Sequence, residues 1–481
     1  MYPAIQSLDE KILTENGKDS VITLPLLVRG KEILEELVEY PVRYGKRTIL
    51  TPDAKLLWPE LVCSSNSLKD IHELPLSEII SFLVKVGYEL NIDTNPYLQR
   101  AIELTKDASN LTEPIIRSSY YMLQEMFSIP SLTGMIRPVG YEYLDGWVKK
   151  QTAFGEASIK AVGVRTLHIP AGNVPAISAL SILNGALTKG DTLIKLPSND
   201  PVTGWAILKT MMDIDPNHPV TKHMTVVYWK GGDAEVEKQL INPTRIEKIV
   251  AWGGHHAISH IKGLIGPGID LVTLDPKFSI SVITKEAFMH DKWSHAARRA
   301  AQDVGYFNQD ACLSSKVIYV ETDPEKACKF GQMVYEYLSS EKLDLSTKPK
   351  SYPLSLKQEL DTIRYLDDYQ VYGGAHNEGA VIVSKEYDSK VDFAESLCSK
   401  TVNIVPIKSV KDVLPAINVA TQTIGLYPES VKPNYRDEFI RAGAQRIVTL
   451  GGAAKGMIGM PQDGVELARR MVKWVVDESS V

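Results

Sequence analysis

Cysteine is scarce in this chain, and its four copies stand far apart. Cys63, Cys312, Cys328 and Cys398 contain no Cys-x-x-Cys pair among them. This spacing excludes a zinc ribbon and provides no disulfide framework. A reducing compartment such as the cytoplasm fits this usage, and it would keep a reactive thiol available.

Long apolar runs and an excess of positive charge are also missing. No apolar stretch approaches the roughly 20 residues that cross a bilayer, and the opening MYPAIQSLDEKIL lacks the basic and apolar regions of a signal peptide. The formal net charge of -6 and the pI near 6.0 argue against a nucleic-acid-binding surface. We therefore expect a cytoplasmic protein with no membrane span and no nucleic-acid partner.

What is present is the composition of a globular protein. Hydrophobic residues make up 44% of the chain and charged residues 23%, which are ordinary values for that class. A length of 481 residues predicts two or three domains. Internal repeats and low-complexity tracts are absent.

Residues 1–150 show helix-like patterns without a chemical motif. Residues 20–28 read as an apolar strand, and helix-like spacing of apolar residues follows at 31–39, 76–91, 97–107 and 113–127. Proline and glycine cluster between residues 130 and 140 and indicate a boundary.

From about residue 160, predicted strands and helices alternate. The strands lie at 162–169, 192–196, 224–229 and 248–252, and the helices at 176–187, 201–212 and 233–240. Such alternation indicates βαβ units and a parallel sheet, the usual platform for a nucleotide. Gly253 and Gly254 follow a strand directly, where glycine lets backbone N–H groups approach a pyrophosphate. They lack the third glycine of GxGxxG, so a plain tight turn explains this pair equally well.

Cys312 is the strongest candidate for chemistry. The segment DVGYFNQDACLSSKVIY places it in a turn just before the β-branched run 317–320. A thiolate held there could attack a carbonyl carbon and retain the acyl group. Free cysteines are, on the other hand, usually buried apolar residues, and this segment alone leaves both interpretations open.

Further elements are predicted around and after this segment. Helices are expected at 286–302, 324–339 and 354–362, and apolar strands at 380–383, 401–405 and 445–450. A last helix is expected at 464–476, where the apolar stripe would pack on the core or on a second subunit.

Four stretches, in the right order, resemble the aldehyde dehydrogenase superfamily. HIPAGNVP is similar to the Asn-containing turn after the first strand of that nucleotide domain, and it contains Asn173. IKLPSNDP is similar to the Lys-Pro-Ser-Glu segment and contains Lys195. VAWGGHH resembles the Thr-Gly-Ser turn, with Gly253 as its glycine, and QDACLSS resembles the Gly-Gln-x-Cys segment, with Cys312 as the nucleophile.

Within this superfamily a narrower likeness exists. The stretches GNVP, HPVT, VVYW, IVAWGG and QDACLSS are similar to those of LuxC-type acyl-CoA and acyl-protein thioester reductases, which supply fatty aldehyde for bacterial luminescence. The likeness covers about 160–320 well and continues more loosely to the C-terminus. Bacteria without luminescence also carry such reductases, so the resemblance does not imply light.

The resemblance implies an α/β fold of the aldehyde dehydrogenase type, with a Rossmann-type nucleotide domain and an α/β catalytic domain that carries the cysteine. The expected parts are a mostly helical region at 1–150 that packs on the nucleotide domain, an NADP-binding domain at 151–285, a catalytic domain at 286–440, and a C-terminal segment at 441–481. That last segment would return to the nucleotide domain or form an oligomer interface. A homo-oligomer is expected, with contacts sought at 135–160 and 445–450.

Two departures from hydrolytic aldehyde dehydrogenases bear on the reaction. Thr273 stands where those enzymes have the glutamate that activates water, so an acyl-cysteine would be poorly hydrolysed and could accept hydride instead. Ser198 stands where NAD-preferring members have a glutamate that would repel a 2′-phosphate. NADPH is therefore the expected cofactor, unless the neighbouring Asp200 takes the place of that carboxylate.

The resemblance also assigns roles. Cys312 would form the acyl-enzyme, while Asn173 and the Cys312 backbone N–H would stabilise the oxyanion. The cofactor-binding positions would be Pro170, Ala171, Gly172, Lys195, Ser198, Gly253 and Gly254. A turn asparagine and a solvated lysine at a strand end are the plain alternatives for Asn173 and Lys195.

The expected activity is NADPH-dependent reduction of a long-chain acyl thioester to the aldehyde. The rivals are a CoA-acylating aldehyde dehydrogenase acting on short chains and a catalytically silent scaffold. Expected partners are an acyl-CoA or acyl-protein substrate and, by resemblance, an acyl-protein synthetase and an acyltransferase in one complex. His256 and His260 have a spacing that a metal could use, but no Cys, Asp or Glu stands near in the sequence, so no metal is expected.

Overall fold

The computed structural model describes residues 21–42, 47–289, 292–340, 343–456 and 458–478. The chain folds into two compact units. Unit 1 holds the described residues of 1–109, 116–275 and 458–481, and unit 2 holds those of 110–115 and 276–457. The divisions at 275/276 and 457/458 differ from the expected domain limits at 285/286 and 440/441, because the segment 276–285 belongs to the second sheet.

Unit 1 is built on a seven-stranded sheet in the order β12-β11-β8-β9-β10-β2-β3. Its five parallel strands are β8 (Arg165–Ile169), β9 (Asp191–Lys195), β10 (Met224–Val227), β11 (Lys248–Trp252) and β12 (Asp270–Leu274). The chain returns between them through α8 (Ala176–Leu187), α9 (Thr203–Ile214), α11 (Ala234–Leu240) and α12 (His255–Leu264). All residues of β9 and β10 are buried, as expected of strands covered on both faces. The βαβ alternation expected from the sequence is thus observed.

The N-terminal part of unit 1 mixes strands with helices. The helices α3 (Leu76–Glu89), α4 (Pro96–Ala108) and α5 (Glu113–Met126) lie where the apolar spacing predicted them, and the first three residues of α5 belong to unit 2. The predicted helix at 31–39 is wrong: these residues form β3 (Lys31–Ile33) and β4 (Leu37–Pro41). β3 pairs with β2 (Leu26–Val28), which itself joins β10, so pairing with the sheet overrides the local helical pattern.

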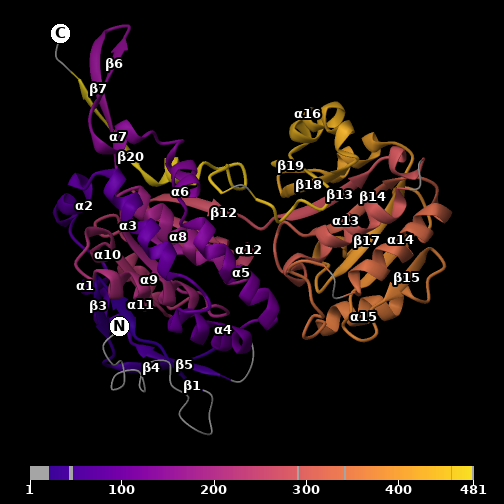
Figure 1. Cartoon of the computed structure of the whole chain (residues 1–481), viewed down its shortest axis with the longest axis horizontal. Helices are drawn as coiled ribbons and strands as arrows, with labels where there is room; N and C mark the ends of the chain where they lie inside the picture. The colour runs from indigo at the N-terminus through magenta and orange to yellow at the C-terminus, as the bar shows by residue number, and fades with distance from the viewer. Residues whose placement is uncertain (1–20, 43–46, 290–291, 341–342, 457, 479–481) are drawn as a thin grey trace. The chain divides into compact units, whose positions relative to one another are not determined.

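The C-terminal residues of unit 1 also differ from expectation. The predicted helix at 464–476 is wrong, because α17 covers only Leu467–Met471 and β20 (Lys473–Glu478) follows it. β20 pairs antiparallel with β7 (Gly155–Val162), which pairs with β6 (Val148–Thr152). Figure 1 shows the yellow β20 beside the magenta β6–β7 hairpin, which extends away from the rest of this unit.

Unit 2 contains a second seven-stranded sheet in the order β15-β16-β17-β14-β13-β18-β19. Its strands are β13 (Phe278–Ile283), β14 (Ser315–Glu321), β15 (Tyr369–Gly373), β16 (Ala380–Ser384), β17 (Thr401–Ile407), β18 (Thr421–Tyr427) and β19 (Arg446–Thr449). One face packs on α13 (Trp293–Gly305) and α14 (Pro324–Leu338), and the other on α15 (Leu354–Ile363) and α16 (Lys432–Ala442). The result is a three-layer α/β/α arrangement with β14 and β13 at its centre.

Candidate active site

Cys312 lies in unit 2, in the turn that leads into β14. Its side chain is exposed, whereas Ala311 before it and Ser314 and Ser315 after it are buried. The Cys312 carbonyl accepts a hydrogen bond from Ser279 Oγ at 2.8 Å. The thiol is therefore accessible while its backbone is anchored to the central strand β13.

The three residues Phe307, Asn308 and Gln309 enter this turn with left-handed backbone angles. Their φ values are 52°, 51° and 71°, a conformation that costs about 1–3 kcal/mol for a residue other than glycine. Gln309 is buried and its amide bonds the Ser315 and Thr401 carbonyls at 2.9 and 2.8 Å, while its Oε1 accepts from the Thr401 N–H at 2.8 Å. The Gln309 side chain thus ties the strained turn to backbone groups at the starts of β14 and β17.

The sheet is irregular where it meets the cysteine. Along β13, Ser279 pairs with Ser315 but Ile280 pairs with Val317, so β14 contains one extra residue. On the other side Phe278 pairs with Thr421 and Ile280 with Ile424, so β18 also contains one. Bulges of this kind re-aim side chains next to active sites.

Gln422, the second residue of β18, reaches the thiol. Its Nε2 donates to Cys312 Sγ at 3.1 Å. Two cations are also close enough to interact with the sulfur: burial lowers the pKa of Lys316 and of Arg446, and interaction with Cys312 acts in the opposite direction. That attraction is mutual, so both cations favour a negative charge on the sulfur. No local signal in the sequence indicated Gln422, Lys316 or Arg446.

The predicted cofactor residues lie in unit 1 at one edge of its sheet. Three short segments carry these residues. The turn after β8 holds Pro170, Ala171, Gly172 and Asn173. The last residue of β9 is Lys195, with Ser198 just beyond it, and the turn after β11 holds Gly253 and Gly254. These three strands are neighbours in the sheet and run parallel, so their carboxyl ends meet at the same edge. This is the edge at which such sheets bind ligands.

Two glycines at this edge have different surroundings. A Cβ on Gly172 would lie 2.9 Å from Pro197 Cγ and press against Asn199, so only glycine allows the two turns to approach this closely. A Cβ on Gly254 would meet nothing within 4 Å. Gly254 is the N-cap of α12, so open space adjoins the N–H groups at the start of a ten-residue helix.

Lys195 provides the charge at this edge. It is 8% exposed, and its Nζ lies 5.6 Å from the Trp229 ring centre and 5.9 Å from that of Tyr228. No hydrogen bond or ion pair joins this ammonium to another residue in the part of the chain that the structure describes. Burial lowers the pKa of Lys195 to about 8, against an opposing effect of Glu237. A buried cation without a partner is available to an anionic or hydroxyl group of a ligand.

Two carboxylates near this edge accept hydrogen bonds. Asp200 is buried at the start of α9, where its Oδ1 accepts from the Thr203 N–H at 3.1 Å and from Thr203 Oγ1 at 2.6 Å, while its Oδ2 has no hydrogen-bond partner among the described residues. Glu237 accepts from the Gly232 N–H at 3.0 Å and contacts His260 Nε2 at 2.6 Å. The Glu237–His260 contact joins α11 to α12 and was missed in the sequence, where the two residues stand 23 positions apart.

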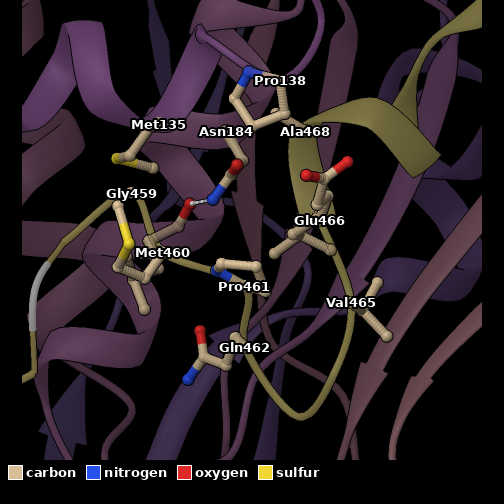
Figure 2. A pocket seen from close by; sticks show the side chains of 12 residues that line it. Met135, Pro138, Asn184, Gly459, Met460, Pro461, Gln462, Val465, Glu466 and Ala468 are labelled. Carbon is tan, nitrogen blue, oxygen red and sulfur yellow. Dashed lines mark hydrogen bonds between the residues drawn. The ribbon is translucent and has the colours of Figure 1, made fainter.

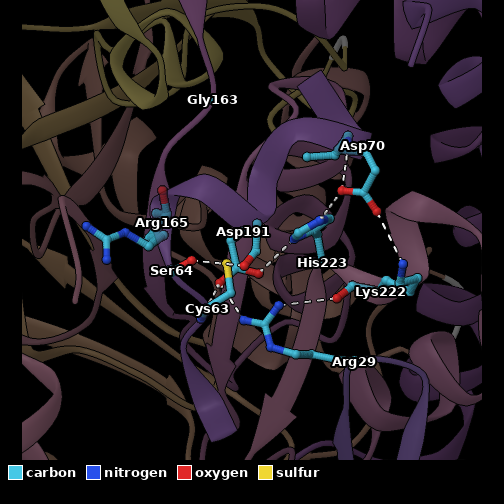
Figure 3. Close-up of polar contacts among 12 residues, drawn as sticks. Arg29, Cys63, Ser64, Asp70, Gly163, Arg165, Asp191, Lys222 and His223 are labelled. Carbon is cyan, nitrogen blue, oxygen red and sulfur yellow. Dashed lines mark hydrogen bonds and ion pairs between the residues drawn. The ribbon is translucent and has the colours of Figure 1, made fainter. Parts of the chain in front are cut away.

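A different cluster gathers at the opposite edge of this sheet. Donor atoms of Cys63, Asp191 and His223 lie within 4.8 Å of one another, the one such group found in the described ranges. Figure 3 shows Asp191 among Arg29, Cys63 and His223. Arg29 Nη2 lies 2.7 Å from Asp191 Oδ2, and His223 bridges Asp191 and Asp70 at 3.2 and 2.8 Å.

This cluster supplies its own partners for the carboxylate. The Asp191 carboxylate is satisfied by Arg29 and His223, and its pKa is lowered because these contacts outweigh the effect of burial. Burial, together with Asp191, raises the pKa of the Cys63 thiol to about 12. The neutral Cys63 thiol and the paired Asp191 carboxylate therefore form a structural cluster, in which the Cys63 N–H donates to Asp191 Oδ2 at 3.5 Å and joins the loop after α1 (Ala54–Leu61) to the sheet.

A small cavity lies between α8, α6 (Ile129–Ile136) and the segment 459–468 of unit 1. Figure 2 shows this C-terminal segment around it, with Met135 and Met460 among the lining residues. Its volume is about 50 Å³, below the ~300 Å³ of the smallest usual ligand pockets. The cavity is therefore large enough for water or a small group and too small for a long alkyl chain.

The structure also bears on Thr273 and on membrane-spanning helices. Thr273 is half-buried on β12, where it pairs with Ala251 of β11. None of the helices in the described part of the chain combines the length and apolar character that a bilayer crossing requires.

The amino-acid sequence of the chain matches a known protein family. The acyl-CoA reductase (LuxC) family matches residues 71–474. The chain is similar to a long-chain acyl-protein thioester reductase of Aliivibrio fischeri, with 26% identity over 95% of this chain and 93% of that protein.

Among solved structures, lactaldehyde dehydrogenase from Escherichia coli superposes with a TM-score of 0.71 at 12% identity, covering 95% of this chain and 99% of its own. The NADP-dependent glyceraldehyde-3-phosphate dehydrogenase from Bacillus halodurans C-125, complexed with NADP, superposes with a TM-score of 0.70 at 11% identity, covering 96% and 99%. The predicted aldehyde dehydrogenase-like α/β fold is confirmed.

Proposed function

Because this chain belongs to the acyl-CoA reductase (LuxC) family of oxidoreductases, we propose that it reduces a long-chain fatty acyl thioester, on CoA or on a protein, to the aldehyde with NADPH. The observation that carries this proposal is the exposed Cys312 thiol, held by a rigid turn with a neutral amide donating to its sulfur. Unit 1 would bind the cofactor and unit 2 would carry the acyl group.

In the first step the Cys312 thiolate attacks the thioester carbonyl carbon. The new C–S bond forms, the oxyanion collapses, and the carrier thiolate leaves and takes up a proton. The Asn173 side chain and the Cys312 backbone N–H would donate to the oxyanion, and one such donor is typically worth ~3 kcal/mol. The product of this step is an acyl-Cys312 thioester.

The cofactor, when bound, supplies a hydride to the acyl carbon. Lys195 and Ser198 would hold the 2′-phosphate, since the buried Lys195 ammonium makes no hydrogen bond or ion pair within the described residues and Ser198 places no carboxylate there. Pro170, Ala171 and Gly172 would line the adjoining turn, while Gly253 and Gly254 would leave room for the pyrophosphate at the start of α12. The solved relative with bound NADP supports a site of this type on this fold.

Thr273 would direct the acyl-enzyme toward reduction. A threonine hydroxyl is not a general base at neutral pH, so water near the acyl carbon is not activated by this residue. The acyl-enzyme then persists until hydride arrives. The resulting thiohemiacetal collapses, and Cys312 is regenerated as the aldehyde departs.

The decisive experiment is intact-protein mass spectrometry after mixing with tetradecanoyl-CoA. We expect an acyl adduct on Cys312 that NADPH discharges as tetradecanal, and none in Cys312→Ala. Absence of an adduct on the parent protein would support the silent scaffold. Faster NADPH consumption with acetyl-CoA than with tetradecanoyl-CoA would support the short-chain acylating dehydrogenase instead.

We also propose that the protein is a homo-oligomer and receives its acyl group within a complex with an acyl-protein synthetase and an acyltransferase. The sheet β20-β7-β6 supports the first part, because Phe154 at its hairpin is 91% exposed and Trp147 and Val476 are about half exposed. Light scattering gives the particle mass of the parent protein and of Phe154→Ser. If the two masses are equal, this surface is not the oligomer interface. The name of the Aliivibrio fischeri relative gives an acyl-protein substrate and no pathway. The luminescence pathway is therefore one setting for such a complex, and other pathways that need fatty aldehyde are further settings.

A further inference from the structure

Gln422 is a buried glutamine whose amide is directed at the reactive thiol. It is 7% exposed, and its Nε2 lies 3.1 Å from Cys312 Sγ. The two residues are 110 positions apart in the chain, so the sheet alone brings them together. An N–H donor binds a thiol weakly and a thiolate strongly, because hydrogen bonds to a charged acceptor are about twice as strong as neutral ones.

The backbone around Gln422 is arranged so that this contact is maintained. The extra residue in β18 falls between Thr421 and Ile424, which is where Gln422 and Thr423 stand. The Thr423 N–H, displaced from the regular ladder, donates to Ser279 Oγ at 3.3 Å. The same Ser279 hydroxyl donates to the Cys312 carbonyl at 2.8 Å. One serine on the central strand thus fixes both the bulge that carries the amide and the turn that carries the sulfur.

We propose that Gln422 is a catalytic residue that donates Nε2–H to the Cys312 thiolate, both before the sulfur attacks the acyl carbon and as the aldehyde leaves it. This inference rests on the proposed function for its place in the reaction. In the attack, an electron pair of the sulfur forms the C–S bond and the sulfur loses its charge. In the release, the thiohemiacetal oxyanion forms the carbonyl, and the C–S electron pair returns to the sulfur, where the amide again donates.

A neutral amide suits a reductase for a second reason. It cannot remove a proton from water, so it stabilises the thiolate without supplying a base for hydrolysis. Other charges also act on the sulfur: Lys316 on β14 and Arg446 on β19 interact with it, and Asp310 stands two residues before it in the turn. These three residues are unchanged in the position-422 variants described below. A change in the reactivity of the Cys312 thiol in those variants is therefore due to the loss of the Gln422 amide.

The test measures the thiolate directly and needs neither acyl substrate nor cofactor. The rate at which iodoacetamide alkylates Cys312 is followed from pH 5 to pH 10 by mass spectrometry of the peptide that contains it. In Gln422→Met, which keeps the length of the side chain without its donor, we expect the midpoint of the profile to rise and the rate at pH 7 to fall about tenfold. Gln422→Glu, which adds a negative charge at the same place, should lower that rate further.

Gln332→Met on the exposed face of α14 is the matched control and should leave the profile unchanged. Circular dichroism shows whether each variant folds, and if Gln422→Met does not, Gln422→Glu decides the question. A profile in the folded variant that coincides with that of the parent overturns the proposal.

The same proteins separate this inference from the proposed function. One outcome is that the parent forms the acyl adduct while the Gln422 variants have the same alkylation profile as the parent. That result supports the reductase and contradicts the proposed role of Gln422. The other outcome is that the alkylation profile of the Gln422 variants shifts while the parent forms no acyl adduct. That result supports the contact of the amide with the thiolate and contradicts the reductase.

Discussion

The ammonium group of Lys195 lies 5.6 Å from the centre of the Trp229 ring. Lys195 ends β9 and Trp229 follows β10, and the two strands pair in parallel, with Lys195 opposite Val227. The aromatic face partly replaces the water that burial removes from the ammonium. The pKa of Lys195 nevertheless falls to about 8, so the charge proposed to hold the cofactor is lost in mildly alkaline solution.

The affinity for NADPH should therefore depend on pH. Below about pH 8 Lys195 is a cation and attracts the 2′-phosphate, while above that pH it becomes neutral and the attraction disappears. We expect the Kd for NADPH to rise about tenfold between pH 7 and pH 9.5, as measured by fluorescence titration. NADH, which has no 2′-phosphate, should show little change. Lys195→Arg should abolish the pH dependence while keeping tight binding, and a parent profile flat from pH 7 to 9.5 would contradict the assignment.

Asn173 is expected to act on the transition state rather than on binding. Asn173→Ala removes one proposed donor to the oxyanion, so kcat for tetradecanoyl-CoA should fall by about 10²–10³ with KM nearly unchanged. Steady-state NADPH consumption measures both constants. Asn217→Ala on an exposed loop is a control that should behave as the parent. A variant at position 173 that raises KM alone would instead indicate a role in substrate binding.

Gly172 is expected to control the shape of the cofactor turn. A methyl group at this position has no space between Pro197 and Asn199, so Gly172→Ala must push apart the turns after β8 and β9. We expect NADPH binding to weaken about tenfold or more, while Cys312 in unit 2 keeps its rate of alkylation. Gly263→Ala in α12 is the control, since a Cβ there meets nothing within 4 Å and alanine favours helix. Unchanged NADPH affinity in Gly172→Ala would place the cofactor elsewhere.

His168 should limit stability in acid. It is fully buried in β8, and neither ring nitrogen has a hydrogen-bond partner in the described structure. Burial lowers its pKa to about 3, whereas an unfolded histidine takes up a proton near pH 6.5. The unfolded chain therefore binds more protons between these values, and stability is lost as the pH falls from 6.5 toward 3.

Replacing this side chain should then stabilise the protein. His168→Leu removes two unsatisfied polar atoms and should raise the free energy of unfolding by about 1–2 kcal/mol at neutral pH, with a larger gain at pH 5. Thermal unfolding followed at both pH values measures this, with the exposed His376→Leu as the control. A lower melting temperature for His168→Leu would show that the imidazole makes a contact through a bound water instead.

Much of the candidate site could be assigned from the sequence because four short stretches resemble motifs of one superfamily. The resemblance marked Asn173, Lys195 and Gly253, and in the structure all three lie at or beyond the carboxyl ends of parallel strands, which meet at one edge. It also marked Cys312, which precedes the run that forms β14. The roles of these residues remain proposals, whereas the fold on which they stand is confirmed by solved structures.

The misses share one cause, which is that their partners lie far along the chain. The spacing at 31–39 suits a helix, yet β3 and β4 form there because β2 and β5 (Thr48–Pro52) are available to pair with them. In 464–476 only Leu467–Met471 are helical, and the chain from Lys473 onward forms β20 because it pairs with β7. Gln422 was missed because nothing local marks it, and its contact with Cys312 depends on two bulges in neighbouring strands.

By itself, the amino-acid sequence determined the alternation of strands and helices, the family to which the chain belongs and the cysteine on which the proposed chemistry depends. Those features are encoded in short-range periodicity and in motifs of a few residues, which survive without knowledge of the partners. Only the tertiary structure decided that the Gln422 amide contacts the Cys312 sulfur, that the Lys195 ammonium is buried and that edge strands form in place of the expected helices. Each of those outcomes depends on burial and on pairing between distant segments, and the free energy of such contacts exists only once the sheets have formed.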